Sequence, residues 1–404
     1  MKVVFVSYDH CDDIGGVSSW LQRLLPLLRV HGIDVEVHFF LIGEARGANQ
    51  TALEKAGIRC RVAPWPADTV QGTRQCWHWL NESQPDVYVP NCIVPAYFAA
   101  AFARQAGAFT VGVLHSDEPF YHGIIDEFVT GLDVWRLDAV VAVSCYLESV
   151  MRRSADRSLT TVRIPCGVPV PPQAAVAGRH PFRLIWTGRM VEEQKRATAT
   201  AQAMAAALDQ WPDAEVIMIG DGSALPAVQA ILAPHLTSGR ARLPGRLGHQ
   251  EIQAALLESD VFVLLSDYEG LPVSLLEAMA SGVVPVCLEM RSGIRDVLQH
   301  EQNGLIVSDR GAAFLAAVGR LKDSPAWRAQ LAGMARSTVA AGFSIDNCAT
   351  RWISLLQTHA GSGRWRATPL PPDHLPLPPL NAKFGHFDRR RSSFAQRLLR
   401  KLTG

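Results

Sequence analysis

The sequence predicts an α/β protein in which two doubly wound parallel sheets face a cleft. Short apolar, β-branched runs alternate with amphipathic helical patterns along residues 1–358, which is typical of parallel sheets covered by helices on both faces. A stretch without periodicity, rich in proline, glycine and alanine, divides this alternation into two series near residues 169–181. The chain has 404 residues, and at about 150 residues per domain this length favours two to three domains.

The first series begins with the β-type run of residues 2–6, which ends before the glycine pair Gly15 and Gly16. Apolar residues then recur at helical spacing over residues 20–28, so the series opens as strand, turn and helix. This series predicts an N-terminal domain over residues 1–168. Further strands are expected near residues 33–40, 58–63, 86–90, 109–114, 139–143 and 160–164, with helical patterns at 73–83, 94–106 and 145–153.

The second series begins after the predicted linker at residues 169–181. It predicts a C-terminal domain over residues 182–343, of which residues 311–340 are helical. Residues 344–360 follow as a helix in which Trp352 and Leu356 lie on one apolar face, and we expect this helix to cross back to the first domain. Strands of the second series are expected near residues 182–187, 214–219, 241–244, 260–264, 284–287 and 304–307.

The C-terminal segment, residues 361–404, differs from the rest in composition. Six prolines fall within residues 369–379, and the segment has a local charge of +7, against −6 for the preceding residues. This composition predicts a flexible arm. Within residues 389–403, an apolar stripe lies beside six arginines and lysines, as in a helix on an anionic membrane surface. A solvated tail, or a tail docked on the acidic body of the protein, would have the same composition.

Composition and charge exclude several classes of protein. Hydrophobic residues make up 48% of the chain, which excludes collagen and wholesale disorder, and a net charge of +1 gives no reason to expect a nucleic-acid partner. The eight cysteines form no C-x-x-C pair, which favours a reducing compartment over a zinc site or a disulfide scaffold. The N-terminus does not resemble a signal peptide, and no apolar run reaches the roughly 20 residues of a membrane span. We therefore expect a cytoplasmic protein, peripheral to the inner face of the plasma membrane if residues 389–403 bind it.

Two carboxylates in residues 266–286, SDYEGLPVSLLEAMASGVVPV, are the most informative feature for chemistry. Pro272 suits the first turn of a helix, so Glu269 lies in the loop before that helix and Glu277 lies more than one turn inside it. The two carboxylates would therefore contact different parts of one ligand. Backbone N–H groups at the helix start, near Gly270, Leu271 and Val273, suit hydroxyls or phosphate. The spacing alone fits equally a capped surface helix with two solvated glutamates.

The region closely resembles the glutamate-x7-glutamate motif of the retaining glycosyltransferases of family 4, which have the GT-B architecture of two Rossmann-like domains. Other family motifs follow in order along residues 1–358, with two departures, Cys166 where the family usually has Asn and Arg196 where it usually has Gly. The matching segments are Gly15 and Gly16, His115 in VLHSD, IPCGVP (164–169), WTGRMVEEQKR (186–196), IGDGS (219–223) and RDVLQHEQNGLIV (295–307).

The resemblance implies a donor that is a nucleoside-diphosphate sugar, a UDP- or GDP-sugar, and no further cofactor. When the glycosidic bond breaks, negative charge grows on the leaving diphosphate, so cations fixed there stabilise the transition state. Arg189 and Lys195 match the family's two cations. The family generally needs no metal on the diphosphate, and the chain contains no Asp-x-Asp triplet.

The remaining residue roles also follow from the resemblance. Glu277 matches the glutamate that binds ribose and Glu269 the one that binds the donor sugar, while Arg246 and Leu247 match the backbone beside the base. The catalytic set it implies is His115, Arg189, Lys195 and Glu269. The donor-binding set adds Gly16, Gly188, Arg246, Leu247, Gly270, Leu271, Pro272, Val273 and Glu277. Gly15 is expected on the acceptor, and so is Asp117, because it lies beside His115.

The expected function is retaining transfer of a sugar to a hydroxyl of a saccharide or lipid-linked acceptor, in bacterial cell-envelope, exopolysaccharide or lipopolysaccharide biosynthesis. A nicotinamide dehydrogenase is a rival, but its G-x-G-x-x-G fingerprint is missing after the first strand. A sugar-nucleotide epimerase or hydrolase of the same fold is a second rival, and a non-catalytic sugar-binding relative is a third.

Overall fold

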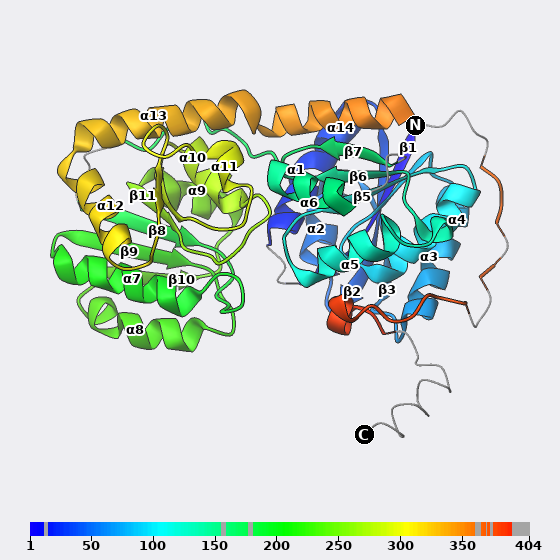
Figure 1. The fold of residues 1–404 in the computed structure, drawn as a ribbon, viewed down its shortest axis with the longest axis horizontal. Helices are drawn as coiled ribbons and strands as arrows, with labels where there is room; N and C mark the ends of the chain where they lie inside the picture. Colours follow the sequence, from blue (N-terminus) through cyan, green and yellow to red (C-terminus); the bar gives the residue numbers. More distant parts are fainter. Residues whose placement is uncertain are drawn as a thin grey trace, which may run out of the picture.

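The computed structural model describes residues 1–11, 15–154, 159–176, 181–359, 365–368, 370–371 and 375–389. Two α/β domains lie side by side, and two long helices run along one side of both (Figure 1). Each domain has one all-parallel sheet. The predicted fold class, two doubly wound parallel-sheet domains, is confirmed.

The N-terminal sheet has seven strands in the order β3-β2-β1-β4-β5-β6-β7. The order reverses between β1 and β4, and the carboxyl ends of strands at such a switch point form the crevice where ligands bind in this class of fold. β1 is buried on both faces, as its uninterrupted apolar run predicted. The strands are β1 Lys2–His10, β2 Asp34–Ile42, β3 Arg59–Pro64, β4 Val87–Pro90, β5 Phe109–Leu114, β6 Ala139–Ala142 and β7 Thr160–Arg163.

Helices cover both faces of this sheet (Figure 1). In α1 the apolar positions Trp20, Leu24 and Leu28 are buried, as their spacing predicted. α3 begins at a capped end, because the side chain of Asp68 accepts a hydrogen bond from the backbone N–H of Gln71. The helices are α1 Gly16–Val30, α2 Ala48–Lys55, α3 Thr69–Ser83, α4 Val94–Gln105, α5 Pro119–Phe128 and α6 Cys145–Ser154, with a 3-10 turn, η1, at Asp133–Trp135.

The C-terminal sheet has six strands in the order β10-β9-β8-β11-β12-β13. The helical stretch expected at residues 311–340 is two helices, because Pro325 lacks the backbone N–H to continue α12 and begins α13. The strands are β8 Phe182–Thr187, β9 Ala214–Ile219, β10 Ala241–Gly245, β11 Val261–Leu264, β12 Val284–Leu288 and β13 Leu305–Val307. The helices are α7 Ala197–Gln210, α8 Leu225–Thr237, α9 His249–Leu257, α10 Val273–Ala280, α11 Ile294–Val297, α12 Ala312–Asp323, α13 Pro325–Gly342 and α14 Ile345–His359.

The helix α14 packs against the N-terminal domain, so the chain passes between the domains twice (Figure 1). Its residue Trp352 is fully buried and lies 5.7 Å from Trp20 and 6.1 Å from Phe5, between ring centroids. Where the chain returns to the first domain, the backbone N–H of Ile345 donates a hydrogen bond to the carbonyl oxygen of Val168 at 2.9 Å. These contacts tie the second crossing to the end of the N-terminal domain.

The described part of the C-terminal segment packs on the N-terminal domain, which differs from the flexible arm that its composition predicts. Phe384, in the 3-10 turn η2 Ala382–Phe387, is 1% exposed and lies over Gly123 of α5. Lys383 pairs with Asp126 of α5 at 2.7 Å, and Asp388 accepts a hydrogen bond from Thr69 at 2.7 Å. Aromatic side chains give this proline-rich segment enough apolar surface to bury. The predicted amphipathic segment, residues 389–403, lies outside the described residues except for Arg389.

Within the ranges that the structure describes, no helix is long and apolar enough to span a membrane.

Candidate active site

The carboxyl ends of the two sheets meet at a tight interface between the domains. A Cβ atom added to Gly270, in the loop after β11, would overlap the carbonyl oxygen of His115 at the end of β5. A Cβ atom added to Gly293, in the loop after β12, would overlap the side chain of Ser144 at the end of β6. Glycine lets the backbone at position 270 approach the His115 backbone, and the backbone at position 293 approach the Ser144 side chain, across the interface. The loops that carry the predicted site residues are therefore brought together.

Glu269 is the most completely held of the predicted site residues. Its Oε1 pairs with Nζ of Lys195 at 2.6 Å, and its Oε2 accepts a hydrogen bond from the Gln194 amide at 3.1 Å. The residue is only 5% exposed. A carboxylate buried to this degree needs its charge compensated, and Lys195 supplies that compensation. The β8–α7 loop and the β11–α10 loop are thus joined through Gln194, Lys195 and Glu269.

Arg189 lies on the same β8–α7 loop as Lys195. Its Nη2 donates to Oε1 of Gln194 at 3.4 Å, and its charge acts on Glu118 of the N-terminal domain. Burial raises the pKa of Glu118, and the proximity of Arg189 partly offsets this rise. The neighbouring Gly188 donates its backbone N–H to Ile219, which fixes the turn after β8 beside the end of β9. Two cations of the C-terminal domain therefore lie at the interface, close to carboxylates of both domains.

Arg196, which stands where the family usually has glycine, has the backbone conformation that explains the family's preference. Its φ is +48°, in the left-handed region that costs an ordinary residue about 1–2 kcal/mol. Its side chain turns to the rim of the site and pairs with Asp267, which also pairs with Arg310. These partners hold the pKa of Asp267 below its usual range despite partial burial. Arg196 thus joins two loops.

Glu277 lies on α10 as its position in the sequence predicted, but it has a partner that the sequence did not suggest. The guanidinium of Arg23, on α1 of the N-terminal domain, forms an ion pair with Oε1 of Glu277 and lies 3.3 Å from Nδ1 of His249. Nη1 of Arg23 is buried and has no hydrogen-bond partner among the residues that the structure describes. Burial lowers the pKa of His249, and Arg23 lowers it further. Glu277 is therefore bound across the interface by the opposite domain.

His115 directly follows β5 and is enclosed by protein, although part of its surface reaches solvent. Its Nε2 lies 2.8 Å from Oδ1 of Asn91, and its ring stands edge-on to Trp20 at 5.0 Å between centroids. Desolvation lowers the pKa of His115 to about 3. Because an amide oxygen only accepts, Nε2 carries the proton, and Nδ1 is left as an acceptor.

We predict that His115 stays neutral between pH 5 and 8. The pKa of His115 is lowered to about 3, below the value near 6.5 of an unfolded chain, so the unfolded chain binds the proton more tightly. The contribution of His115 to folding stability is therefore lost as the pH falls from about 6.5 to about 3. The carbon-bound imidazole proton of His115, assigned by comparison with His115→Asn, should show no chemical-shift titration over this range in NMR spectra. A midpoint near pH 6.5 would contradict the burial described for this ring.

Asp117, expected beside the acceptor, is a buried hydrogen-bond acceptor. It accepts from Nε2 of His122 at 2.8 Å and from the hydroxyl of Tyr146, on α6, at 2.9 Å. Nε of Arg291, in the loop after β12, lies 4.0 Å from the same carboxylate. Asp117 therefore holds together loops of both domains at a point two residues from His115.

The other predicted residues lie in loops after strands or at the starts of helices. Arg246 follows β10 and pairs with Asp221 at 3.3 Å. Because β10 is the outermost strand on one side of the C-terminal sheet, Arg246 lies far from the loop after β12, which is near the other side. Leu247 follows it and is half-buried. Gly15 precedes α1, and a Cβ atom on Gly16 would have room, since its nearest neighbour is Val273 at 3.5 Å. Pro272 caps α10, and Leu271 beside it is buried.

Sequence reasoning missed Arg23, Asn91 and Tyr146. Asn91 follows β4 as His115 follows β5, so its place at a strand end was a usable signal. Tyr146 likewise stands one residue inside the helix after β6. Nothing in the sequence marks Arg23, which lies on a helix whose other residues form an ordinary amphipathic pattern. Within the described ranges, no group of three or more His, Cys, Asp or Glu side chains is arranged to hold a metal ion.

Comparisons with known proteins find similarity to glycosyltransferases in sequence and in fold. Residues 181–324 match the family model described as Glycosyl transferases group 1. The lipopolysaccharide 1,6-galactosyltransferase of Escherichia coli K12 is 23% identical over 324 residues, which cover 75% of this chain and 84% of that one. A glycogen synthase of Mycobacterium tuberculosis is 25% identical over 333 residues, covering 79% and 76% of the two chains.

Solved structures support the fold at lower identity. The Anabaena protein Alr3699/HepE, in complex with UDP, superposes with a TM-score of 0.69 at 17% identity, over 89% of this chain and 100% of that one. The pneumococcal O-GlcNAc transferase GtfA, in complex with UDP and GlcNAc, superposes with a TM-score of 0.73 at 13% identity, over 89% and 99% of the two chains.

Proposed function

We propose that this chain, a glycosyltransferase with the GT-B fold of the group 1 superfamily, transfers a sugar from a nucleoside-diphosphate sugar to an acceptor hydroxyl with retention of configuration. In this proposal the C-terminal domain, residues 182–343, binds the donor, and the N-terminal domain, residues 1–168, binds the acceptor. Residues 169–181 link them, and residues 344–360 return to the first domain.

The observation that carries the proposal is that four charged side chains lie on the two C-terminal loops and the helix that face the N-terminal domain, one of which meets the backbone of His115 at Gly270. Lys195 and Glu269 are paired at 2.6 Å, Arg189 shares their partner Gln194, and Glu277 lies one helix turn and a loop further on. In this proposal the base lies beside Arg246 and Leu247, after β10, and the diphosphate lies at Arg189 and Lys195, after β8. The ribose and the donor sugar lie at Glu277 and Glu269, in the helix and the loop after β11. Backbone N–H groups of residues 270–273, with Gly16 and Gly188, complete this donor site.

The proposed chemistry is substitution on the face of the sugar that the diphosphate leaves. The bond between C1 and the phosphate oxygen breaks, and the diphosphate keeps the electron pair. The acceptor oxygen then bonds to C1, and its proton passes to that phosphate oxygen. Arg189 and Lys195 would stabilise the charge as it grows. Neutral His115 would accept a hydrogen bond from a donor-sugar hydroxyl at Nδ1.

We further propose a role in bacterial cell-envelope, lipopolysaccharide or exopolysaccharide biosynthesis, with a saccharide or lipid-linked acceptor. Relatives named for lipopolysaccharide and colanic acid biosynthesis support it. Residues 389–403 would bring the enzyme to the inner face of the plasma membrane from the cytoplasm. The donor is a UDP- or GDP-sugar, and UDP is bound in several of the neighbouring structures.

The proposed function is tested by product analysis. The protein is incubated with UDP-glucose, UDP-galactose, UDP-GlcNAc or GDP-mannose and a panel of acceptors made of methyl glycosides and the oligosaccharide released from rough lipopolysaccharide. NMR of the product reports the anomeric configuration. An α-linked product from an α-linked donor supports retaining transfer. An inverted linkage, or an epimerised donor without product, would favour another reaction of the same fold.

Removal of Arg23 is predicted to strengthen nucleotide binding. Arg23 pairs with the carboxylate of Glu277, which the ribose hydroxyls would bind in this proposal, so a bound nucleoside diphosphate must displace Arg23 from that carboxylate. Because the two side chains are only 13% and 18% exposed, the cost of removing both charges from water offsets most of their attraction, and we expect a net effect of about 1 kcal/mol, or about fivefold in affinity. Calorimetric titration of UDP or GDP into Arg23→Met should therefore give a dissociation constant a few-fold lower than that of the wild type. Weaker binding would mean that Arg23 itself contacts the nucleotide.

A further inference from the structure

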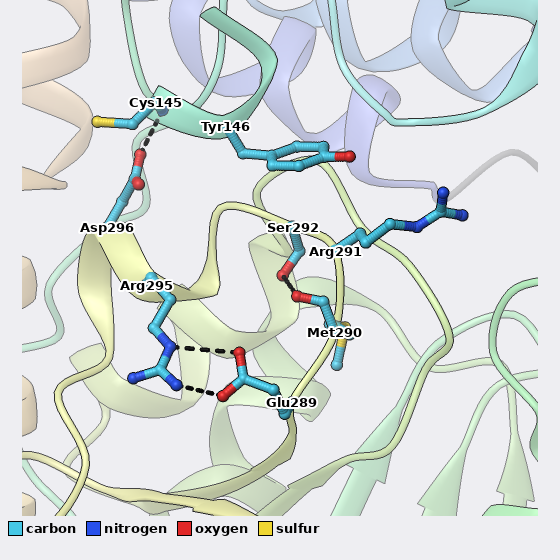
Figure 2. A pocket seen from close by; sticks show the side chains of 8 residues that line it. All are labelled: Cys145, Tyr146, Glu289, Met290, Arg291, Ser292, Arg295 and Asp296. Atoms are coloured by element: carbon cyan, nitrogen blue, oxygen red, sulfur yellow. Dashed lines mark hydrogen bonds and ion pairs between the residues drawn. The ribbon is translucent and has the colours of Figure 1, made fainter. Parts of the chain in front are cut away.

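A cavity of about 630 Å³, wide open to solvent, lies between the domains, beside the proposed donor site. The N-terminal domain contributes Cys145 and Tyr146 at the start of α6, and the C-terminal domain contributes residues 289–296 after β12. Figure 2 shows the ring of Tyr146 across from Met290 and Ser292, with Arg291 reaching out beside its hydroxyl. Neither the predicted donor site nor its cations line this cavity.

The order of the strands places this cavity next to the donor sugar. In the C-terminal sheet β12 lies beside β11, whose loop carries Glu269, and neighbouring strands are about 4.8 Å apart. In the N-terminal sheet β6 lies beside β5, which His115 follows directly. The contact of Gly293 with Ser144 is therefore one strand further along the interface than the contact of Gly270 with His115. Arg246, at the base end, lies in the opposite direction.

Direct hydrogen bonds connect the cavity to the reacting centre. The backbone N–H of Glu269 donates to the carbonyl of Arg291 at 3.2 Å, and that of Gly293 donates to Gly270 at 2.6 Å. On the other side the Tyr146 hydroxyl donates to Asp117, two residues from His115. A group held in the cavity would thus adjoin a sugar held by Glu269 and His115, which is where an acceptor hydroxyl must approach.

The chemistry of the lining suits an uncharged saccharide. Its charges balance: Arg295 pairs with Glu289, Asp296 accepts the backbone N–H of Cys145 at 2.6 Å, and Arg291 stands 4.0 Å from Asp117. The side chain of Arg291 is 72% exposed, so it has N–H groups to offer to a ligand. The Tyr146 ring supplies an apolar face beside these polar groups, as saccharide rings require.

We propose that this cavity is the acceptor subsite and holds an uncharged sugar unit of the acceptor. The proposal rests on the proposed function for its reaction, but the binding it describes is separate from turnover. Arg291 and the Tyr146 ring contact the sugar unit. Asp117 orients Tyr146 through a hydrogen bond and holds Arg291 of the other domain near it.

Cys145 offers a measurement of binding that needs no activity. Cys145 is an exposed cysteine among the lining residues, with its sulfur directed away from the Tyr146 ring (Figure 2), and Cys11 is a second exposed cysteine outside the cavity. Burial and Asp296 raise the pKa of Cys145, so alkylation with N-ethylmaleimide is run at pH 8.5 and followed peptide by peptide by mass spectrometry. The probes are methyl α-glucoside, methyl α-galactoside and glucose 6-phosphate, each with UDP or GDP present. A saccharide at about ten times its dissociation constant should slow alkylation of Cys145 about tenfold and leave Cys11 unchanged.

Filling the cavity tests its part in transfer. Cys145→Trp should lower transfer about tenfold or more and leave the dissociation constant of the nucleotide unchanged. Val134→Trp, which adds the same kind of bulk at a position 47% exposed in the same domain, is the matched control. The lipopolysaccharide oligosaccharide and the methyl glycosides serve as acceptors.

The outcomes separate this inference from the proposed function. Protection of Cys145 by an uncharged saccharide, together with loss of transfer in Cys145→Trp, supports both. Protection without any transfer by the wild type supports the subsite and contradicts the transferase proposal. Transfer by the wild type with no protection, or full transfer by Cys145→Trp, overturns the subsite. Better protection by glucose 6-phosphate than by the methyl glycosides overturns the assignment to an uncharged unit.

Discussion

Replacing Arg189 and Lys195 together with alanine is expected to reduce turnover by at least about 10²-fold, the effect of losing a fixed donor of charge stabilisation. The two cations lie on one loop at the interface, where the leaving diphosphate gains negative charge in the proposed reaction. Because that charge is larger in the transition state than in the bound donor, kcat should fall more than the donor KM rises. Initial rates over a range of donor concentrations separate the two parameters.

Lys195 also compensates buried Glu269, so its single variants need a control. Lys195→Ala leaves that carboxylate with only the Gln194 amide, and some loss of folding stability is expected. Lys195→Arg keeps the charge and should keep more activity than Lys195→Ala. Lys322→Ala removes a lysine that pairs with Asp213 at the surface and should change neither rate nor melting temperature. Full turnover in the folded double variant would refute the assignment of the two cations.

Gly270→Ala is expected to produce the second large loss, because the two domains could no longer meet. The added Cβ atom would overlap the carbonyl of His115 and lie 3.0 Å from Cα of Ser116. These are backbone atoms, so no change of rotamer relieves the overlap. A displacement of about 1 Å between reacting groups can cost about 10²-fold in rate, and we expect kcat to fall by about that factor.

The same variant should alter the shape of the protein in solution. Small-angle X-ray scattering should show a larger radius of gyration for Gly270→Ala than for the wild type, since the domains are held apart. Gly333→Ala, in α13, is the matched control because a Cβ atom there meets nothing within 4 Å. Wild-type turnover and an unchanged scattering curve for Gly270→Ala would contradict the closed interface described here.

The sequence predicted the sheets well because their strands are buried on both faces. Runs such as residues 3–6 and 261–264 are uninterrupted apolar segments, and their bounds agree with the structure to within a few residues. The break at Pro325 inside the long C-terminal helical stretch was also visible in the sequence, but periodicity on both sides of it favoured a single stretch. Local sequence patterns were therefore enough to predict most of the strands and helices.

The contacts across the interface could not be predicted in the same way. The pairing of Arg23 with Glu277 joins residues 254 positions apart and depends on how the two domains approach each other. The packing of Phe384 on α5 is similar: prolines and basic residues around it predicted a flexible arm, and only the position of Gly123 creates the space for its ring. Such contacts follow from tertiary geometry, which no local pattern encodes.

The most direct test of a nucleotide-sugar site at Glu277 is the melting temperature of the wild type and of Glu277→Ala with UDP, GDP, ADP, CMP or NAD. A ligand at about 100 times its dissociation constant stabilises the protein that binds it by about 2.7 kcal/mol. We predict that UDP or GDP raises the melting temperature of the wild type and of Glu258→Ala, a control at a surface glutamate that is 62% exposed, but not that of Glu277→Ala. Stabilisation by NAD alone, or equal stabilisation of Glu277→Ala by UDP or GDP, would contradict the site proposed here.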